Sequence, residues 1–434
     1  GSATLSRLAM SKGWWAATVV FAAVAAAWAW AGIQPAFTAP LPNASNIAEV
    51  RMMDFRDAIY YPVKELLAGG NPYDPAAMLA HWPIRQTFNL YLPYHLMVTA
   101  PFALDDYRSG AAAFTGVTLV LVLLIALMAA WQLRARVPLL AGFAGFSALL
   151  LVGEVGKGQL FAGQINPYVA IGAAGTFLLR RAHPGWAMFA LAMAWVKPQY
   201  GLPIAVLLMF RGSWRVAAGG TAIAALASLP VVGLLMSRDG FLGFFQTLAR
   251  NISWSRSRDY LAVDSVTAHR PDVAGVFFRV TGLTVPMLEV VVLVVVLVAT
   301  GLLARRLDAM SNRTELTPVA DLMCLTAVVI ALIHQPGDIL CALPAMAAVV
   351  AVFWRRFGDL GWMPVLAVAL LLVTHLHHQV VDHAIVAIAG ARAAVTVDGV
   401  AMIAAWLVLV VYALLRTRVA APRPQSHLAV VAST

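Results

Sequence analysis

Charged residues are scarce in this 434-residue chain. Asp, Glu, Lys and Arg together make up 12% of it, against about a quarter in ordinary soluble domains. Hydrophobic residues make up 61%, and the mean hydropathy is +0.81. The shortage of charge excludes a typical soluble protein and predicts an integral membrane protein. The apolar runs are long and lack the period-two alternation of barrel strands, so the predicted fold class is all-α and polytopic.

Cysteine is nearly absent. The two cysteines, Cys324 and Cys341, both lie inside apolar runs. This excludes a disulfide framework and argues against a cysteine zinc site, so we expect both to be packing residues. Acidic residues are also few, and the formal net charge is +10. The basic residues stand mainly in short pairs between apolar runs, which is the positive-inside pattern of membrane proteins rather than a nucleic-acid surface.

Reading the apolar runs against their basic ends predicts about twelve spans in a single domain, 1–434, with both termini cytoplasmic. Two large extracytoplasmic loops are predicted, at 33–107 and 237–283, followed much later by a disordered cytoplasmic tail at 419–434. The first apolar run is long enough to span, so we expect a helix there rather than a cleaved signal peptide.

The unusual polar residues fall on one side of this topology. The short basic loops lie on the cytoplasmic side, and the remaining polar side chains lie outside. A carrier would place such groups near the bilayer midplane, often in paired repeats, and we find no internal repeat. One-sided polarity predicts a reaction at the outer boundary of the membrane. The outward residues are Asp54, Glu154, Gln164, Lys197, Arg256, Arg258, His334, Asp338 and the histidines near position 377.

The segment DFRDAIYYPVKELLAGGNPYD, residues 54–74, carries two carboxylates one helical turn apart, Asp54 and Asp57. An apolar stripe follows, and Gly69 and Gly70 predict the end of the helix. Asp54 is equally compatible with a helix N-cap and with a catalytic carboxylate at the headgroup level.

Two motifs place polar groups at predicted span ends. GQLFAGQINPYV, residues 158–169, contains Gln164 and Asn166, and such a stretch at membrane depth lines a wet cavity or packs on protein. AWVKPQYGLP contains Lys197 and Gln199. A lone lysine at a helix end either snorkels to the surface or meets an anion, for which a phosphate is suitable.

Three further stretches carry aromatic, basic or histidine side chains. YLPYHL contains His95 and is compatible with a sugar site or an interfacial anchor. The loop 251–270 combines basic and aromatic residues that suit phosphate and sugar, and it is equally compatible with a solvated basic loop. HQPGD predicts a hydrogen-bonded pair of His334 and Asp338. His377 and His378 project about 100° apart on a helix, so we expect no metal site there.

These motifs, in their order and spacing, resemble the polytopic glycosyltransferases of carbohydrate-active family 87. The resemblance rests on residues 54–74, GQINPYV, KPQYGLPIAVLLMFRGSWR and the late-helix histidine, and it covers about Asp54 to Asp338. These are GT-C-fold enzymes of actinobacterial envelope synthesis, among them polyprenyl-phosphate-mannose-dependent α-mannosyltransferases and arabinofuranosyltransferases. LYLPYHLM and HQPGD depart from the usual family pattern, which leaves the donor sugar and the acceptor open.

The resemblance implies an inverting transfer from a polyprenyl-phosphate sugar to a glycolipid or lipoglycan at the outer face. Asp54 matches the base and His334 the late-helix histidine, so these two are the expected catalytic residues. Cations take the place of a divalent metal, so no cofactor is expected. Mannose is preferred over arabinofuranose, and a lipid or polysaccharide transporter is the rival from another class. Substrate contacts are expected from Asp57, Tyr61, His95, Gln164, Asn166, Lys197, Gln199, Trp254, Arg256, Arg258, His269 and Arg270.

Overall fold

The computed structural model describes residues 10–257, 262–263, 269–310 and 315–419, and every regular element among them is a helix. The all-α prediction is therefore confirmed. Six helices are long and apolar enough to cross a membrane, and the protein is membrane-embedded. They are α1 (Lys12–Thr38), α5 (Tyr107–Leu133), α11 (Trp214–Asp239), α14 (Leu288–Ala309), α17 (Trp362–Val380) and α19 (Ala391–Val419).

The remaining apolar helices are shorter or bent. The pair α6 (Leu139–Val152) and α7 (Glu154–Ala162) bends by 61° and together is long enough for a seventh span. Each of the twelve predicted spans contains a helix, but the number of crossings stays a prediction, because the other apolar helices are only 10–17 residues long. These others are α8 (Asn166–Leu179), α9 (Pro184–Ala194), α10 (Pro198–Phe210), α15 (Leu316–Ala331) and the continuous pair of η3 (Pro336–Ala342) and α16 (Leu343–Val352).

The connections predicted as large loops contain short helices. The first holds η1 (Phe55–Tyr60), α2 (Tyr61–Leu67), α3 (Pro75–His81), α4 (His95–Thr99) and η2 (Ala100–Ala103). The second holds α12 (Phe241–Ser257) and α13 (Val273–Thr281), and α18 (Asp382–Ala389) joins α17 to α19. The predicted tail lies, from residue 420 on, outside the described part of the chain.

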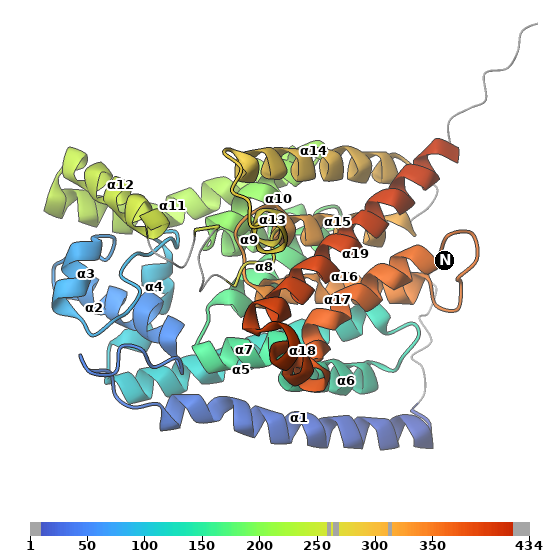
Figure 1. Ribbon diagram of the computed structural model, residues 1–434, viewed down its shortest axis with the longest axis horizontal. Coiled ribbons are helices and arrows are strands. Elements are labelled where there is room, and N and C mark those ends of the chain that lie inside the picture. The colour runs from blue at the N-terminus through green and yellow to red at the C-terminus, as the bar shows by residue number, and fades with distance from the viewer. Residues whose placement is uncertain (1–9, 258–261, 264–268, 311–314, 420–434) are drawn as a thin grey trace, which may run out of the picture.

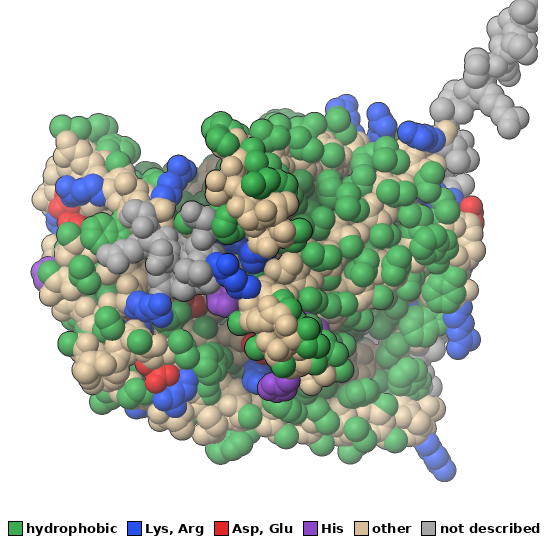
Figure 2. Space-filling view, in the orientation of Figure 1, with side chains coloured by type: hydrophobic (Ala, Val, Ile, Leu, Met, Phe, Trp, Pro, Cys, Tyr) green, Lys and Arg blue, Asp and Glu red, His purple; other side chains and the backbone are tan. Residues whose placement is uncertain are grey.

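The long helices run side by side, and the short ones gather at one end (Figure 1). Helices α2, α3, α4 and α12 lie at that end, while the start of α1 and the end of α19 lie at the other. Figure 2 shows a mostly hydrophobic surface over α14, α17 and α19, as contact with lipid requires. A recess edged by charged and histidine side chains separates this body from the end that carries α2, α3 and α12.

Helix α15 forms the centre of the bundle. All thirteen positions from Val319 to Ala331 are buried, and the helix contacts α10, α14, α16 and α19. A helix that is apolar all round is stable only when other elements surround it. The chain leaves α15 at Leu332, and in the HQPGD motif that follows His334 and Asp338 are buried whereas Gln335 is exposed.

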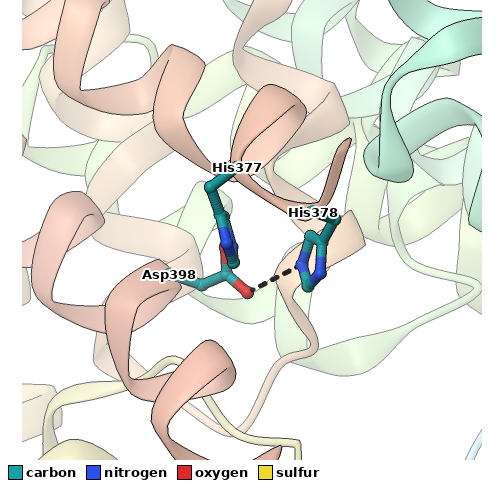
Figure 3. A group of neighbouring side chains, drawn as sticks. All are labelled: His377, His378 and Asp398. Carbon is teal, nitrogen blue, oxygen red and sulfur yellow. Dashed lines mark hydrogen bonds and ion pairs between the residues drawn. The ribbon is translucent and has the colours of Figure 1, made fainter. Parts of the chain in front are cut away.

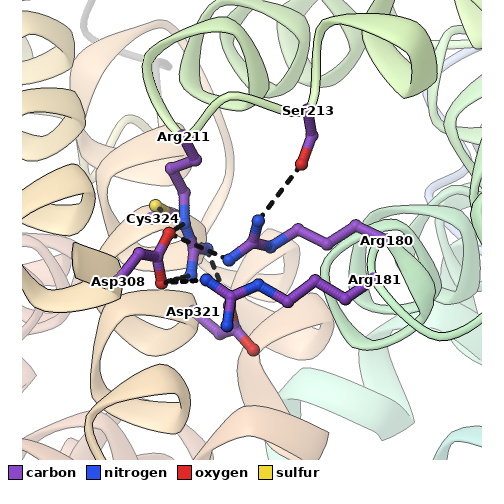
Figure 4. Close-up of polar contacts among 7 residues, drawn as sticks. All are labelled: Arg180, Arg181, Arg211, Ser213, Asp308, Asp321 and Cys324. Atoms are coloured by element: carbon purple, nitrogen blue, oxygen red, sulfur yellow. Dashed lines mark hydrogen bonds and ion pairs between the residues drawn. The ribbon is translucent and has the colours of Figure 1, made fainter. Parts of the chain in front are cut away.

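A buried ionic cluster ties four helices together (Figure 4). Asp308 on α14 lies 2.9 Å from Arg180, 3.3 Å from Arg181 and 2.8 Å from Arg211, and Arg211 also lies 2.7 Å from Asp321 on α15. Arg180 and Arg211 stand at the ends of α8 and α10. Since the Arg211 side chain is fully buried, its charge is stable there only while both aspartates are present.

Replacing Asp308 should destabilise the fold. Asp308→Ala removes the ion-pair partner of the buried Arg180 and leaves Arg211 with Asp321 alone, and breaking a buried pair costs about 3–5 kcal/mol. The matched control is Glu315→Ala, whose ion pair with Arg356 is exposed on both sides and contributes about 0–1 kcal/mol. We expect a lower unfolding midpoint in detergent for Asp308→Ala only. Equal midpoints for the two variants would contradict a structural role of the cluster.

Candidate active site

Asp54 stands at the start of η1 and points toward α7. Its backbone is helical, with φ −72° and ψ −35°, and its side chain makes no capping bond, so the N-cap interpretation is wrong. Instead, Gln164 donates its Nε2 hydrogen to Asp54 Oδ2 over 2.6 Å. The main-chain N–H of Met52 donates to the carbonyl of Phe161 over 2.8 Å, which fixes the start of η1 against the end of α7. The predicted apolar stripe is buried as expected, but the polar η1 residues Arg56 and Asp57 are buried with it.

Gly163 allows this close approach. It ends α7 with φ +68°, the left-handed region that favours glycine. A Cβ atom at this position would lie 2.7 Å from Phe55 Cβ. Position 163 therefore requires glycine for two reasons: the backbone is left-handed there, and there is no space for a side chain. Because Gln164 is the next residue, the packing of Gly163 on Phe55 sets the distance from the Gln164 amide to the Asp54 carboxylate.

Lys197 supplies the positive charge of the site. It precedes α10, is 6% exposed, and acts electrostatically on the two carboxylates of Asp54 and Asp338. Its Nζ lies 5.8 Å from the centre of the Tyr91 ring. Snorkelling to the surface is therefore the wrong interpretation. The main-chain N–H of Leu92 donates to Val196 over 2.9 Å, which holds the Tyr91 segment beside Lys197.

The surroundings of Asp54 raise the pKa of its carboxyl from 3.8 to about 6. Burial is the largest cause, and the negative charges of Asp57 and Asp338 add to it. Lys197 and the Gln164 hydrogen bond oppose the shift by stabilising the charged form. Asp54 nevertheless keeps intermediate exposure, whereas Asp57 and Asp338 are only 2% and 4% exposed. Among these three carboxylates, Asp54 is the one that a bound molecule can reach.

His334 is engaged on both ring nitrogens. Its Nδ1 lies 2.8 Å from Asp338 Oδ2, which confirms the predicted pair, and its Nε2 lies 3.1 Å from the main-chain oxygen of Gln199. With a partner on each nitrogen, the orientation of the ring is fixed from both sides. The ring also packs edge-on against Tyr200, with centroids 4.6 Å apart. His334 therefore joins α10 to η3.

Asn166 links the same elements. Its side chain is fully buried, its Oδ1 accepts a hydrogen bond from the Tyr200 hydroxyl over 2.8 Å, and its Nδ2 donates to Gly337 over 3.5 Å. Gln159 on α7 donates to the same carbonyl over 3.1 Å. These contacts fix η3 against α7 and α8, and so fix the position of Asp338 relative to Asp54.

Comparison with known protein families gives one match. The family model described as Glycosyltransferase family 87 matches residues 89–336, more than half of the chain. The chain belongs to glycosyltransferase family 87. It is therefore a membrane-embedded glycosyltransferase that acts on a sugar donor and an acceptor. No curated protein and no solved structure matches it.

The family 87 match includes much of the site, but it begins after its first carboxylates. Lys197, Gln164 and His334 lie within the matched residues, whereas Asp54 and Asp57 lie before them. For this glycosyltransferase the assignment of Asp54 therefore depends on the contacts that residues inside the match make with it.

Asp57 is held away from Asp54 by its own partners. Arg56 Nε lies 2.6 Å from Asp57 Oδ1, and the main-chain N–H of Gln86 donates to Oδ2 over 3.0 Å. Both carboxylate oxygens are thus occupied inside the protein. Tyr61, the neighbouring predicted contact, stacks on Trp82 with ring centres 5.2 Å apart.

His95 is also engaged inside the protein. It is fully buried, its Nδ1 lies 2.8 Å from the carbonyl oxygen of Leu92, and its Nε2 lies 3.5 Å from Asn89 Nδ2. Burial lowers the pKa of His95 to about 4. A neutral ring that donates to Leu92 and accepts from Asn89 satisfies both contacts.

Asn89 connects the site to α12. Asn251 accepts from the Asn89 main-chain N–H over 3.0 Å and donates to its carbonyl over 2.7 Å. The Asn89 side chain in turn accepts from the Tyr91 N–H over 2.9 Å. This pair of hydrogen bonds fixes α12 at Asn251 against the segment that carries Tyr91, and further along α12 Trp254 is partly buried and Arg256 is exposed.

Three basic residues remain among the predicted substrate contacts, and each has a different outcome. Arg258 lies outside the described residues. Arg270 is buried in ion pairs with Asp272 at 2.8 Å and Glu289 at 2.6 Å, rather than facing Asp54. His269 is exposed and interacts electrostatically with Asp398 on α19, so it belongs to a different region.

Tyr91, Gln335 and Asp338 belong to the site but were not among the predicted contacts. Gln335 accepts from Gln164 over 3.4 Å, and Asp338 shares Lys197 with Asp54. The sequence feature that could have identified them is their position in YLPYHL and HQPGD, two motifs already selected for their histidines.

Gly163→Ala tests the packing that presents Gln164. The added methyl meets Phe55, whose Cβ moves only with its backbone, and a misplacement of about 1 Å costs roughly 100-fold in rate. The control is Gly212→Ala, which has the same left-handed strain, with φ +75°, but open space around its Cβ. We expect glycosyl transfer to fall only in Gly163→Ala. Equal losses would show that strain alone, not the contact with Phe55, accounts for the effect.

Proposed function

We propose that this glycosyltransferase moves a sugar, with mannose as the preferred donor sugar, from a polyprenyl phosphate to a glycolipid or lipoglycan acceptor of the cell envelope. The transfer proceeds with inversion, and Asp54 acts as the general base. The observation that supports this most directly is the position of Asp54, a reachable carboxylate between the Gln164 amide and the Lys197 ammonium.

Asp54 has the basicity that proton removal needs. An ordinary aspartate binds protons weakly at neutral pH, whereas a pKa of about 6 lies close to working pH and leaves the group mostly ionised. The base takes the proton from the acceptor hydroxyl while its oxygen attacks the anomeric carbon and the phosphate departs. One carboxylate suffices, because no covalent glycosyl-enzyme forms. Positioned base catalysis contributes about 100- to 10,000-fold in rate.

The departing phosphate needs more positive charge than Lys197 alone provides. Asp54 and Asp338 carry two negative charges when ionised, and Lys197 acts electrostatically on both of them. A lipid phosphate entering this group therefore requires further cations. Arg256 and Arg258, at the end of α12 and just beyond it, are our candidates for this role, together with Trp254 as an aromatic surface for the sugar.

The engaged polar residues act as positioning groups in this proposal. His334 and Asn166 hold α10 and η3 in place, and Asp57 and His95 hold the segment that carries Tyr91. No divalent metal takes part in the transfer step, since cationic side chains stabilise the leaving group. The prenyl chain would lie along the apolar helices beside the recess in Figure 2.

We propose the plasma membrane as the location, with both termini cytoplasmic and the site on the extracytoplasmic face. The basic cluster of Arg180, Arg181 and Arg211 supports this orientation, since short basic loops favour the cytoplasm. Both described ends of the chain also lie at the end of the molecule opposite α2, α3 and α12 (Figure 1).

Asp54→Asn should abolish transfer without disturbing the fold. The amide keeps the shape of the carboxylate but takes no proton, so we expect a loss of about 100-fold or more in turnover. The control is Asp105→Asn, an exposed carboxylate of the same connection. Each purified protein is incubated with a glycolipid acceptor and either polyprenyl-phosphate mannose or polyprenyl-phosphate arabinofuranose, and the product mass is measured.

The added mass identifies the donor sugar. A hexose supports the proposal, and a pentose replaces mannose by arabinofuranose while leaving the role of Asp54 unchanged. Full turnover in Asp54→Asn eliminates it as the base.

The rate should depend on pH through Asp54. The base must be ionised, so kcat/KM should fall as the pH drops through about 6. Gln164→Ala removes a hydrogen bond that stabilises the ionised form, so the acidic limb should move to higher pH. An acidic limb near pH 4, or one that Gln164→Ala leaves in place, would contradict the assignment.

A further inference from the structure

A second polar group lies between α17 and α19, away from the transfer site. It contains six buried side-chain atoms that make no hydrogen bond: the Thr374 hydroxyl, both His375 nitrogens, His377 Nδ1, Asp382 Oδ1 and Asp398 Oδ2. Asp398 and His375 are both fully buried. Unpaired polar atoms are costly in an apolar interior, so this concentration needs a physical explanation.

Figure 3 shows that His377 and His378 on α17 both approach the carboxylate of Asp398 on α19. His377 Nε2 lies 2.6 Å from Asp398 Oδ1, and His378 Nε2 lies 3.5 Å from Asp398 Oδ2. The two rings lie 3.9 Å apart at their centres. The expectation that His377 and His378 diverge is therefore wrong, because their side chains turn back toward the same carboxylate on α19.

We propose that His377, His378 and Asp398 bind a divalent transition metal, with zinc as the expected ion. One ligand atom from each residue lies within 4.8 Å of the others, and ligand atoms about 2.0–2.2 Å from a tetrahedral zinc ion lie roughly 3.3 Å apart. Binding replaces the proton between His377 and Asp398, and that contact lengthens by a fraction of an ångström. Asp398 Oδ2, whose contact with His378 Nε2 is 3.5 Å long, then gains a closer partner.

The donor set selects the class of metal. Two imidazoles and one carboxylate suit zinc and its neighbours in the first transition row, while magnesium and calcium prefer oxygen ligands alone. His378 Nδ1 lies 3.5 Å from Asp382 Oδ2. A carboxylate behind a histidine ligand orients the ring and raises its basicity, as is usual in zinc sites.

The proposed metal site joins helices that lie next to α7, one of the helices around the transfer site. It connects α17 to α19 across α18, and the same end of α17 packs on the bend between α6 and α7. A Cβ at Gly153, in that bend, would lie 2.7 Å from the main-chain oxygen of His375. The metal therefore acts as a structural tie next to α7, and it takes no part in the transfer step.

Zinc binding by the purified full-length protein tests this proposal. After removal of metal by a chelator, titration with Zn²⁺ should show one bound ion per chain and a higher unfolding midpoint, and Mg²⁺ should change neither. His378→Ala and Asp398→Asn should lose the bound ion. Asp382→Asn should keep it with about 10- to 100-fold weaker affinity. His383→Ala, an exposed histidine of the same segment, should bind like the unchanged protein.

The outcomes separate this proposal from the proposed function. An elution volume and a helical signal equal to those of the parent protein would show that His378→Ala is folded. The folded variant should then transfer sugar in the presence of EDTA at low temperature. Zinc bound equally by His378→Ala and the parent, or no zinc bound by the parent, would overturn the metal site. Loss of transfer in Asp54→Asn is independent of either result.

Discussion

The arrangement of the site depends on one ammonium group that acts on two carboxylates, one buried and one partly exposed. Lys197 stands between Asp54 from the first connection and Asp338 from η3, elements that are far apart in the sequence. In a low-dielectric interior, none of these three charges is stable alone. The need to neutralise Lys197 therefore brings α10, η1 and η3 together, and the neutral hydrogen bonds around them fix the distances.

The hydrogen bonds around Lys197 give Asp338 and Asp54 different roles. Asp338 also accepts from His334, so its charge is largely satisfied inside the protein. Asp54 accepts a hydrogen bond from the Gln164 amide and stays partly exposed. The same lysine thus serves one carboxylate that is closed off and one that remains open to a substrate, which is the asymmetry that a general base requires.

The sequence predicted the membrane class and the helical segments because both depend on composition and local hydropathy. It also predicted the pair of His334 and Asp338, four residues apart. It failed where contacts are long-range. The N-cap interpretation of Asp54 was wrong because Gly163 and Gln164, more than a hundred residues later, approach η1 from the side. The divergence of His377 and His378 was wrong because helical angle describes where Cβ points, not where a long side chain ends.

The family match and the geometry cover different parts of the protein. Residues 89–336 establish a glycosyltransferase of family 87, while Asp54 enters through its contacts with Gln164 and Lys197. Helices of 10–17 residues in the middle of the bundle leave room at one end for the connections that carry Asp54, Tyr91 and α12. Polar backbone and side chains are tolerated there because they are enclosed by protein or reached by water.

The most direct test is a structure of the full-length enzyme with a non-transferable polyprenyl-phosphate sugar and acceptor. The account predicts that Asp54 lies within about 3 Å of the acceptor hydroxyl, a distance suited to proton transfer, with Lys197 the nearest described cation to the sugar phosphate. A phosphate bound away from Lys197, or an acceptor hydroxyl on the far side of the sugar from Asp54, would contradict it.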